Sequence, residues 1–503
     1  MYEKMPYGTS DPYIIPCFTP VTNSSVILEI REKLYLDLEQ LKNNLSQEAL
    51  DGLLEELQNA LSFENPAFIA ALRYGSRKRY IKAPRELCYM HIRKPKTSPS
   101  IEIPIGFLET LINILRDHQI NFQIKNLLTS EKPEQLFKSS IQLRDYQSHA
   151  LEDMLKRHRG VLVAPCGAGK TIMALSLINQ RQQKTLILVH TLDLLKQWSN
   201  QIQNFLGQTC GVIGGGKKNY GEDITVATVQ TLIRDRTLLL KLQKKIGCLI
   251  VDECHHVPAT TFTKLVGKLR PNYLYGFSAT PNREDGLSPV MHLFLGPTLH
   301  RIKPEDLQAN EQLIRPHLKI IKTEFEFEYN HEEADSYQRL MEALITDSKR
   351  NLLIKNALME HQKSFNLILS QRVNHCYQLH AMLNFAGVSS RVITGQTPKE
   401  EREIILEEIR QGKNHYLFAT QLADEGLDIR RLDKIWLVTP SRNISRIEQR
   451  VGRIMRLFEG KDHACVYDFV DRKIKLLEKQ FKTRYYKVYK RLLNVPARLR
   501  WED

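Results

Sequence analysis

A glycine-rich loop that ends in Gly-Lys-Thr constrains the fold of this chain more than any other feature. It follows an apolar run at 161–163, precedes a helical pattern, and consists of Ala164, Pro165, Cys166, Gly167, Ala168, Gly169, Lys170 and Thr171. The glycines let backbone N–H groups close around phosphate oxygens, the lysine can reach the outer phosphates, and the threonine hydroxyl can bind Mg²⁺. The simpler alternative is a glycine turn, and the usual first glycine is alanine here. The loop predicts a nucleoside-triphosphate site next to a parallel sheet.

An acidic pair follows a second apolar run, at 248–251. Asp252 is expected to hold Mg²⁺ and Glu253 to orient the attacking water, because phosphoryl transfer needs positioning and charge neutralisation. Two other interpretations were weighed. The pair could be a solvated strand end, or the neighbouring residues could bind zinc, although their spacing fits no common zinc pattern; these residues are Cys248, Cys254, His255 and His256.

Strand-like runs alternate with helical stretches twice along the chain, which predicts two tandem α/β domains with parallel sheets. The first set of expected strands is 161–163, 185–190, 248–251 and 273–278. The second set is 365–370, 391–394, 416–419 and 435–439, with a helix that carries Ile404, Ile405 and Ile409. The domain boundaries are expected at 136–300 and 301–472.

The two ends of the chain have a different character. Residues 1–135 are expected to form a smaller α+β accessory domain that starts with helices, because Leu34, Leu38, Leu41 and Leu45 share one helical face. The polar stretch 129–133 is the expected linker. Residues 473–503, rich in basic and aromatic side chains, are expected to form a basic tail.

Composition narrows the class of partner. The 72 Lys and Arg residues against 57 Asp and Glu give a net charge of +15, which favours a polyanion as the binding partner. The simpler alternative is a basic surface that only contacts solvent. The eight cysteines form no C-x-x-C pair, as expected for reduced thiols in a cytosolic protein. No apolar run approaches the roughly 20 residues of a membrane span, and the first ten residues lack a signal-peptide pattern. A cytoplasmic or nucleoid-associated protein is therefore expected.

The motifs, taken in order, resemble those of the superfamily 2 helicases and, within them, the XPB-like group. The matching segments are 143–147 (Q motif), 167–171 (motif I), 252–255 (motif II), 278–280 (motif III), 419–428 (motif V) and 449–456 (motif VI). The resemblance runs from about 141 to 469. It implies two RecA-like domains that bind ATP and Mg²⁺ between them.

The resemblance also implies roles for single residues around ATP. The first domain would contribute adenine contacts from Arg144 and Gln147. From the second domain, Arg453 and Arg456 would stabilise charge on the γ-phosphate. Supporting nucleotide contacts would come from Gln449, Arg450, Gly426 and Asp428. Coupling between nucleotide and nucleic acid would involve His255, Ser278, Ala279 and Thr280.

Nucleic acid is the partner that the resemblance implies, held mainly through its backbone. The matching positions are Thr191, Thr228, Arg283, Thr394, Gly395 and Thr420, each of which alone could be a turn or cap residue. The triplet 283–285 resembles the RED motif of XPB-like helicases, with an exposed charged turn as the alternative. The stretch 330–349 leaves little room for the thumb that some of these proteins carry.

DNA is favoured over RNA, because motif II lacks Asp-Glu-Ala-Asp and no long domain follows motif VI. Three hypotheses remain open: a DNA helicase or branch-remodelling enzyme, a duplex translocase that does not separate strands, and a binding clamp that has lost hydrolysis. Residues 61–125, with Phe63 to Pro66, a basic stretch at 73–80 and Ile103 to Gly106, loosely resemble a damage-recognition-like domain. A packing or partner-binding domain is the equal alternative.

Overall fold

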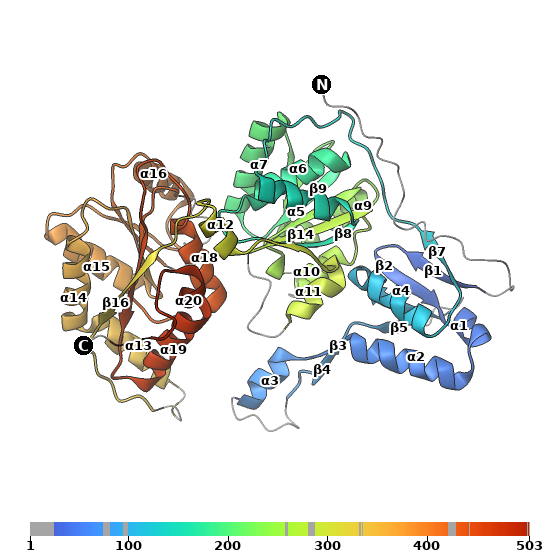
Figure 1. The fold of residues 1–503 in the computed structure, drawn as a ribbon, viewed down its shortest axis with the longest axis horizontal. Coiled ribbons are helices and arrows are strands. Elements are labelled where there is room, and N and C mark those ends of the chain that lie inside the picture. Colours follow the sequence, from blue (N-terminus) through green and yellow to red (C-terminus); the bar gives the residue numbers. More distant parts are fainter. Residues whose placement is uncertain are drawn as a thin grey trace. The chain divides into compact units, whose positions relative to one another are not determined.

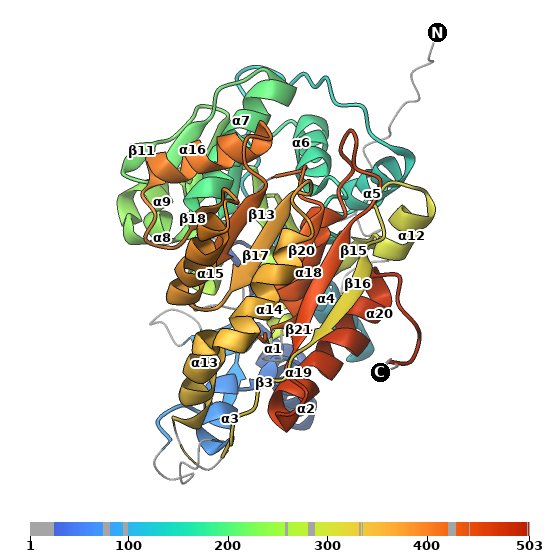
Figure 2. The same cartoon turned by 90° about the vertical axis from the view of Figure 1, so that its left-hand side faces the viewer.

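The computed structural model describes residues 25–73, 81–93, 99–256, 260–279, 287–330, 333, 335–420, 429–441, 443–499 and 501. The chain divides into two compact units, shown as ribbons in Figures 1 and 2. The first unit comprises Met1–Leu162 and Thr171–Arg301, and the second comprises Val163–Lys170 and Ile302–Asp503. Each unit is described by itself below.

The first unit starts with a small α+β domain, drawn in blue in Figure 1. Its sheet has the order β5-β6-β2-β1-β7, with bounds β1 Val26–Ile30, β2 Lys33–Asp37, β5 His91–Arg93, β6 Ser100–Pro104 and β7 Phe122–Asn126. The helices are α1 Leu38–Asn44, α2 Gln47–Ala60, α3 Pro66–Arg73 and α4 Leu108–Asp117, and a two-stranded sheet pairs β3 Ser62–Glu64 with β4 Glu86–Cys88. Alternate residues of β1 and β2 are buried, as expected for strands with one covered face.

The expectation that this domain starts with helices is wrong. Leu34 and Leu36 lie in β2, where both are fully buried while Lys33 and Tyr35 face the other side. The first helix starts only at Leu38, after Asp37 caps it by accepting a hydrogen bond from the backbone of Glu39. The leucine spacing fits a helix, but the same residues also fit the two-residue period of a strand followed by a short helix.

The small domain is packed tightly against the α/β domain that follows. The short helix η2 (Ile105–Phe107) lies on α11 (Ser288–Leu295), and a Cβ at Gly106 would meet the carbonyl oxygen of His292 at 2.4 Å. Because the obstacle is backbone, only glycine fits this position. The expected linker at 129–133 is also packed, since Thr129 N donates to Arg270 O at 2.7 Å.

The α/β domain of the first unit is built on an eight-stranded sheet of order β11-β10-β12-β9-β13-β14-β8-β15. The strands are β8 Arg159–Val163, β9 Thr185–Val189, β10 Gly211–Gly214, β11 Lys217–Asn219, β12 Ile224–Thr228, β13 Cys248–Asp252, β14 Tyr273–Ser278 and β15 Thr298–Arg301. The helices are α5 Asp145–Leu155, α6 Lys170–Arg181, α7 Leu192–Leu206, α8 Val229–Arg234, α9 Arg236–Gln243, η3 Cys254–His256 and α10 Thr260–Val266, besides α11. Strands β9, β12 and β13 are parallel and buried along their whole length, which is typical of a sheet covered on both faces.

The second unit contains a parallel six-stranded sheet of order β16-β21-β20-β17-β19-β18; Figure 2 views this unit from its helix side. The strands are β16 His317–Lys322, β17 Asn366–Ser370, β18 Arg391–Ile393, β19 Tyr416–Thr420, β20 Lys434–Leu437 and β21 Cys465–Val470. The helices are α12 Pro304–Ala309, α13 Ser336–Thr346, α14 Ser348–Met359, α15 Val373–Phe385, α16 Lys399–Arg410, α18 Ile444–Ile454, α19 Lys475–Arg484, η4 Tyr485–Tyr489 and α20 Lys490–Leu492. Trp436 stacks on Tyr467 in its core, with ring centroids 3.7 Å apart.

The alternating pattern predicted both sheets, and all eight expected strands are present within two residues of their expected ends. The segment expected to be a basic tail is helical instead. Phe481, Tyr485 and Tyr489 are buried there, and the buried Arg484 donates two hydrogen bonds to Asp468 of β21. The tail is therefore part of the second domain. Helix α13 fills most of the 330–349 stretch, packing Leu340 and Leu344 near Ile474.

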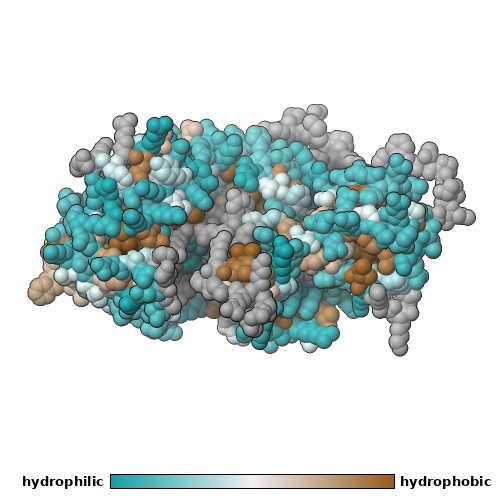
Figure 3. Space-filling model, turned by 90° about the horizontal axis from the view of Figure 1, so that it is seen from below, coloured by the Kyte–Doolittle hydropathy of each residue, from teal (hydrophilic) through white to brown (hydrophobic). Residues whose placement is uncertain are grey.

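The surface seen in Figure 3 is mainly hydrophilic, with hydrophobic residues in small areas. Among the described residues, no helix is both long and apolar enough to cross a membrane.

Candidate functional site

The glycine-rich loop has the backbone shape that its sequence predicts. Gly167 and Gly169 have φ of 89° and 81°, a left-handed conformation that residues with a side chain rarely adopt. Lys170 is the first residue of α6, and its Nζ lies 3.3 Å from the carbonyl oxygen of Ala164. A loop that turns this way at a helix N-terminus presents backbone N–H groups to an anion. The loop therefore fits the phosphates of a nucleotide, and Thr171 follows at the helix start, where its hydroxyl could bind Mg²⁺.

The acidic pair lies where strand β13 ends. Asp252 is its last residue and is 7 % exposed. One carboxylate oxygen, Oδ1, accepts the backbone N–H of Glu253 at 2.9 Å, and the other, Oδ2, accepts the indole N–H of Trp198 at 2.8 Å. Glu253 has a φ of 47°, unusual for a residue with a side chain, so the chain bends sharply where the strand stops. The two carboxylates contact different groups, since Asp252 is held by Trp198 and Glu253 lies near His255.

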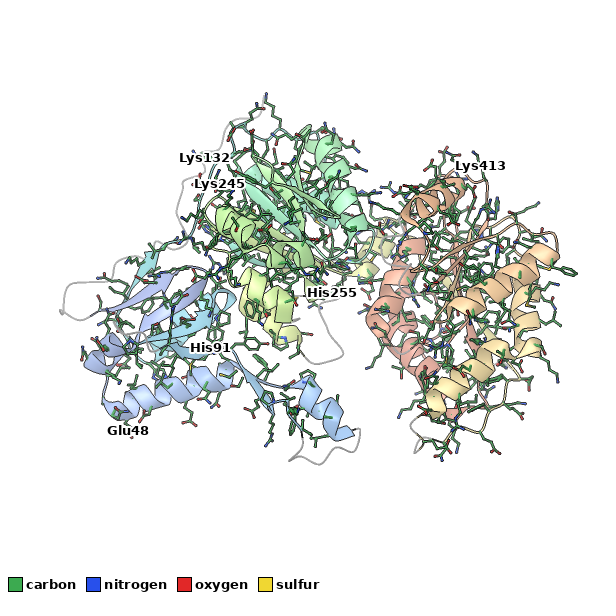
Figure 4. All side chains as sticks on the ribbon, turned by 180° about the vertical axis from the view of Figure 1, so that it is seen from behind. Glu48, His91, Lys132, Lys245, His255 and Lys413 are labelled. Atoms are coloured by element: carbon green, nitrogen blue, oxygen red, sulfur yellow. The ribbon has the colours of Figure 1, made fainter. Side chains whose placement is uncertain are left out.

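Motifs II and III meet across the adjacent strands β13 and β14. The Nδ1 atom of His255 lies 3.1 Å from Ser278 Oγ and 3.4 Å from Glu253 Oε2. Figure 4 marks His255 on the first unit. A histidine that contacts both the carboxylate of Glu253 and the serine that ends the neighbouring strand β14 can transmit a shift between them. Ala279 is partly exposed beside this contact, and Thr280 lies outside the described residues.

The nearby cysteines face the core. Cys254 is fully buried, with its Sγ 3.5 Å from the sulfur of Met291. Burial raises the pKa of the Cys248 thiol to about 12, so this thiol stays protonated at neutral pH. A zinc-bound cysteine is a thiolate, and both residues instead pack as small hydrophobic side chains.

The Q-motif residues lie at the start of α5. Gln147 is largely buried, and its Oε1 accepts the backbone N–H of Arg144 at 3.0 Å. Its amide nitrogen lies 3.3 Å from the hydroxyl of Tyr146. Gln147 thus caps the helix that would carry the adenine contact, a structural role that the motif alone did not predict.

Motif VI occupies the second half of helix α18 and the two residues after its end. Gln449 and Arg453 are four residues apart and lie along one face of α18, Arg456 follows the helix end, and Arg450 is buried. Lys461 donates a hydrogen bond to the carbonyl oxygen of Arg456 at 2.9 Å and another to Arg430 at 3.4 Å. The two motif V residues that are expected to contact the nucleotide, Gly426 and Asp428, lie outside the described residues.

The positions expected to bind nucleic acid differ in exposure. Thr191 caps α7, accepting the backbone N–H of Leu194, and stays partly exposed, and Gly395 is exposed. In contrast, the hydroxyl of the buried Thr228 donates to Thr231, and the buried Thr394 accepts from Gln396. Their hydroxyls therefore hold turns in shape. Thr420 is also buried, and Arg283 lies outside the described residues, as does most of the basic 73–80 stretch.

Two residues of this site were missed from the sequence. Trp198 holds the carboxylate of Asp252, and Lys461 holds the loop that carries Arg456. Burial lowers the pKa of Lys461 to about 8, a cost that a surface lysine does not have. Neither residue belongs to a motif that was considered, and each contact joins segments whose closeness only the fold reveals.

Comparison with known proteins gives matches along both α/β domains. The family model described as "Type III restriction enzyme, res subunit" matches residues 140–283, and "Helicase conserved C-terminal domain" matches 348–458. The DNA 3′-5′ translocase XPB2 of Sulfurisphaera tokodaii is 28% identical over 373 residues, 66% of this chain and 83% of that protein. Probable helicase D10 of Escherichia phage T5 is 31% identical over 319 residues, 60% of this chain and 66% of that protein.

A solved structure agrees at the level of fold. The ATP-dependent Type ISP restriction-modification enzyme LlaBIII, bound to DNA, is 16% identical, with a TM-score of 0.53 over 71% of this chain and 30% of that chain. The two matched domains, their motifs and these relatives agree with one another. The chain belongs to the superfamily 2 helicases, in the XPB-like group, and is an ATP-hydrolysing enzyme with two RecA-like domains.

Proposed function

We propose that this chain couples ATP hydrolysis to movement along DNA, or to the remodelling of DNA, in repair, recombination or defence. The observation that carries the proposal is the contact of His255 with both Glu253 and Ser278, because it links the hydrolytic carboxylate to motif III. Two relatives are named as a DNA translocase and a DNA helicase, and another is named as a putative RNA helicase; the motifs and the first two relatives lead us to favour DNA. Such an enzyme acts where DNA is, in the cytoplasm or nucleoid.

Each site residue then has a chemical task. Lys170 and the loop N–H groups bind the outer phosphates, and Asp252 with Thr171 would hold Mg²⁺. The metal supplies positive charge to the phosphate oxygens when bound. Glu253 orients the attacking water and accepts its proton, and Arg453 and Arg456 of the second domain neutralise the charge that develops on the γ-phosphate.

Adenine would be held by Arg144 and Gln147, and the rest of the nucleotide by Gln449, Arg450, Gly426 and Asp428. Nucleic acid would contact Thr191, Gly395, Arg283 and the segment at Thr420, and the turns that Thr228 and Thr394 hold in shape. Backbone contacts of this kind carry little sequence information, so we expect weak sequence preference. The small N-terminal domain would bind structured DNA or a protein partner.

Steady-state ATPase activity tests the proposal, measured at one stated salt concentration without nucleic acid and then with single-stranded, duplex and forked DNA and with RNA. We expect the strongest stimulation from forked or duplex DNA. Stimulation mainly by RNA would overturn the choice of substrate and leave the motor assignment standing. An absence of stimulation by any nucleic acid would revive the hypothesis of a clamp without hydrolysis.

Strand displacement and duplex-translocation assays separate the two DNA hypotheses. A helicase releases the displaced strand of a fork, whereas a duplex translocase removes a third strand from a triplex without opening the duplex. Lys170→Ala is the control in both assays, since it should remove ATPase activity and leave DNA binding partly intact.

A further inference from the structure

A buried tryptophan contacts the carboxylate of Asp252. Trp198 lies in the middle of α7 and is 1 % exposed, and its Nε1 donates to Asp252 Oδ2 at 2.8 Å. The two residues are 54 positions apart in the sequence. A side chain this buried makes no contact with substrate, so any influence on chemistry passes through Asp252.

The geometry of this contact restricts how the carboxylate can turn. An indole donates a single hydrogen bond from a rigid ring, and here the ring is enclosed by the core. Because the backbone of Glu253 holds the other oxygen, Oδ1, at 2.9 Å, the plane of the carboxylate is fixed at both oxygens. Each carboxylate oxygen has two lone-pair directions, so these two hydrogen bonds also fix where the other lone pairs point. Trp198 thus sets the direction in which Asp252 can offer an oxygen.

The same helix reaches the surface where nucleic acid is expected. Thr191 caps the N-terminus of α7 and is partly exposed. Seven residues separate it from Trp198, which is two helical turns or about 10 Å along the axis, on the same face. A helix is stiff over that length, so a small shift of its N-terminus moves the indole and the carboxylate with it.

We propose that Trp198 is a positioning residue that couples nucleic acid at the N-terminus of α7 to the orientation of Asp252. The proposal rests on the proposed function, in which Asp252 holds the catalytic Mg²⁺. Partners that orient a metal-binding side chain commonly change metal affinity when they are removed. The indole therefore matters for two measurable quantities, the Mg²⁺ requirement of hydrolysis and its stimulation by DNA.

Trp436 provides a matched control. It is also fully buried, and its Nε1 donates to Asn366 Oδ1 at 2.9 Å in the core of the second unit. Trp198→Phe and Trp436→Phe each remove one indole hydrogen bond and keep an aromatic ring. A change seen in both variants is attributed to lost core packing. A change seen only in Trp198→Phe is attributed to the lost hydrogen bond to the carboxylate of Asp252.

The first experiment measures ATPase activity of the full chain across a Mg²⁺ titration, with and without forked DNA, after thermal melting confirms that each variant is folded. We expect Trp198→Phe to need about 10-fold more Mg²⁺ for half-maximal rate, to recover at high Mg²⁺, and to lose most of its DNA stimulation. Trp436→Phe should match the wild type in both quantities. Equal behaviour of the two variants, or a wild-type Mg²⁺ requirement in Trp198→Phe, would overturn the proposal.

The second experiment does not depend on activity. With ¹⁵N-labelled tryptophan, the indole N–H signals of Trp198 and Trp436 are identified by their loss in the two variants. Paramagnetic Mn²⁺ in place of Mg²⁺ should broaden the Trp198 signal far more than that of Trp436. Equal broadening would overturn the inference, whereas inactivity of the wild type with all nucleic acids would contradict only the proposed function.

Discussion

Two aspartates stand at the ends of buried parallel strands, and their surroundings differ. Asp252 closes β13 in the first unit and accepts hydrogen bonds from two neutral donors, the Trp198 indole and the Glu253 backbone. Asp471 directly follows β21 in the second unit and accepts two hydrogen bonds from the guanidinium of Arg350, with both side chains fully buried. Asp471 and its arginine are both enclosed by protein, whereas Asp252 is 7 % exposed at the end of its strand.

The comparison shows that an acidic residue at a strand end is not by itself a metal site. In the second unit the pattern recurs within β21, where Arg484 donates two hydrogen bonds to Asp468 and Tyr489 donates a third. These carboxylates hold α14 and the C-terminal helices on the sheet. A buried arginine that pairs with the carboxylate therefore marks Asp468 and Asp471 as structural.

The largest expected effect is on chemistry in the first unit. Glu253→Gln removes the group that orients water and accepts its proton, so we expect kcat to fall about 10²- to 10⁴-fold. ATP should still bind with near wild-type affinity, because the phosphate loop is unchanged. Steady-state ATPase and nucleotide-binding titrations measure both quantities. Hydrolysis at the normal rate would show that Glu253 does not have this role.

The next effect is on stability in the second unit. Arg350→Met leaves Asp471 buried without its cation, and breaking such a pair typically costs about 3–5 kcal/mol. Asp252→Asn keeps the shape of the side chain at its strand end, and we expect it to cost less than Arg350→Met. Denaturant unfolding, followed by hydrogen exchange of β21 and β13 amides, compares the two. Similar losses in both variants would remove the distinction between the aspartates.

A smaller effect concerns histidine and pH. Burial, reinforced by Arg350, lowers the pKa of the fully buried His375 to about 3, while its ring bonds Ser370 and Asn351. The unfolded chain binds this proton first, so stability is fully present above pH 6.5 and is lost as pH falls towards 3. At pH 5.5 the loss should be about 1 kcal/mol relative to pH 7.5.

Hydrogen exchange of β17 amides at both pH values measures this loss, with His375→Gln as the reference. The variant keeps a polar group but cannot take up the proton, so the wild type should lose more protection than the variant. An equal loss in both proteins would show that His375 stays uncharged in the unfolded chain or becomes charged in the fold.

Much of the fold follows from local pattern. The strands of both sheets have short β-branched runs, and Gly167, Gly169 and Lys170 lie in the turn that their order predicts. Local pattern failed where two periods fit the same residues, as at Leu34 to Leu41, and where basic composition hid buried aromatic side chains, as at Tyr485 and Tyr489. Charge along the sequence does not reveal which side chains are paired inside.

The residues of the candidate site also fall into two groups, those that the motifs predicted and those that only the fold reveals. Asp252, Glu253, His255 and Ser278 were expected from motifs, and the fold brings them together because β13 and β14 are neighbours. Trp198 was not expected, since it lies 54 residues from Asp252 and the contact depends on how α7 packs over the sheet. Arg350 and Asp471, 121 residues apart, were missed for the same reason.

The most direct test compares Asp252→Asn with Asp471→Asn in one experiment, DNA-stimulated ATPase at a temperature where both variants are folded. We predict that Asp252→Asn loses about 100-fold or more in rate, because the residue that would hold the metal is neutral. Asp471→Asn should keep most of the wild-type rate per folded molecule while melting at a lower temperature. Near wild-type hydrolysis by Asp252→Asn, or an equal loss of rate in both variants, would contradict the assignment of Asp252 as the metal-binding carboxylate.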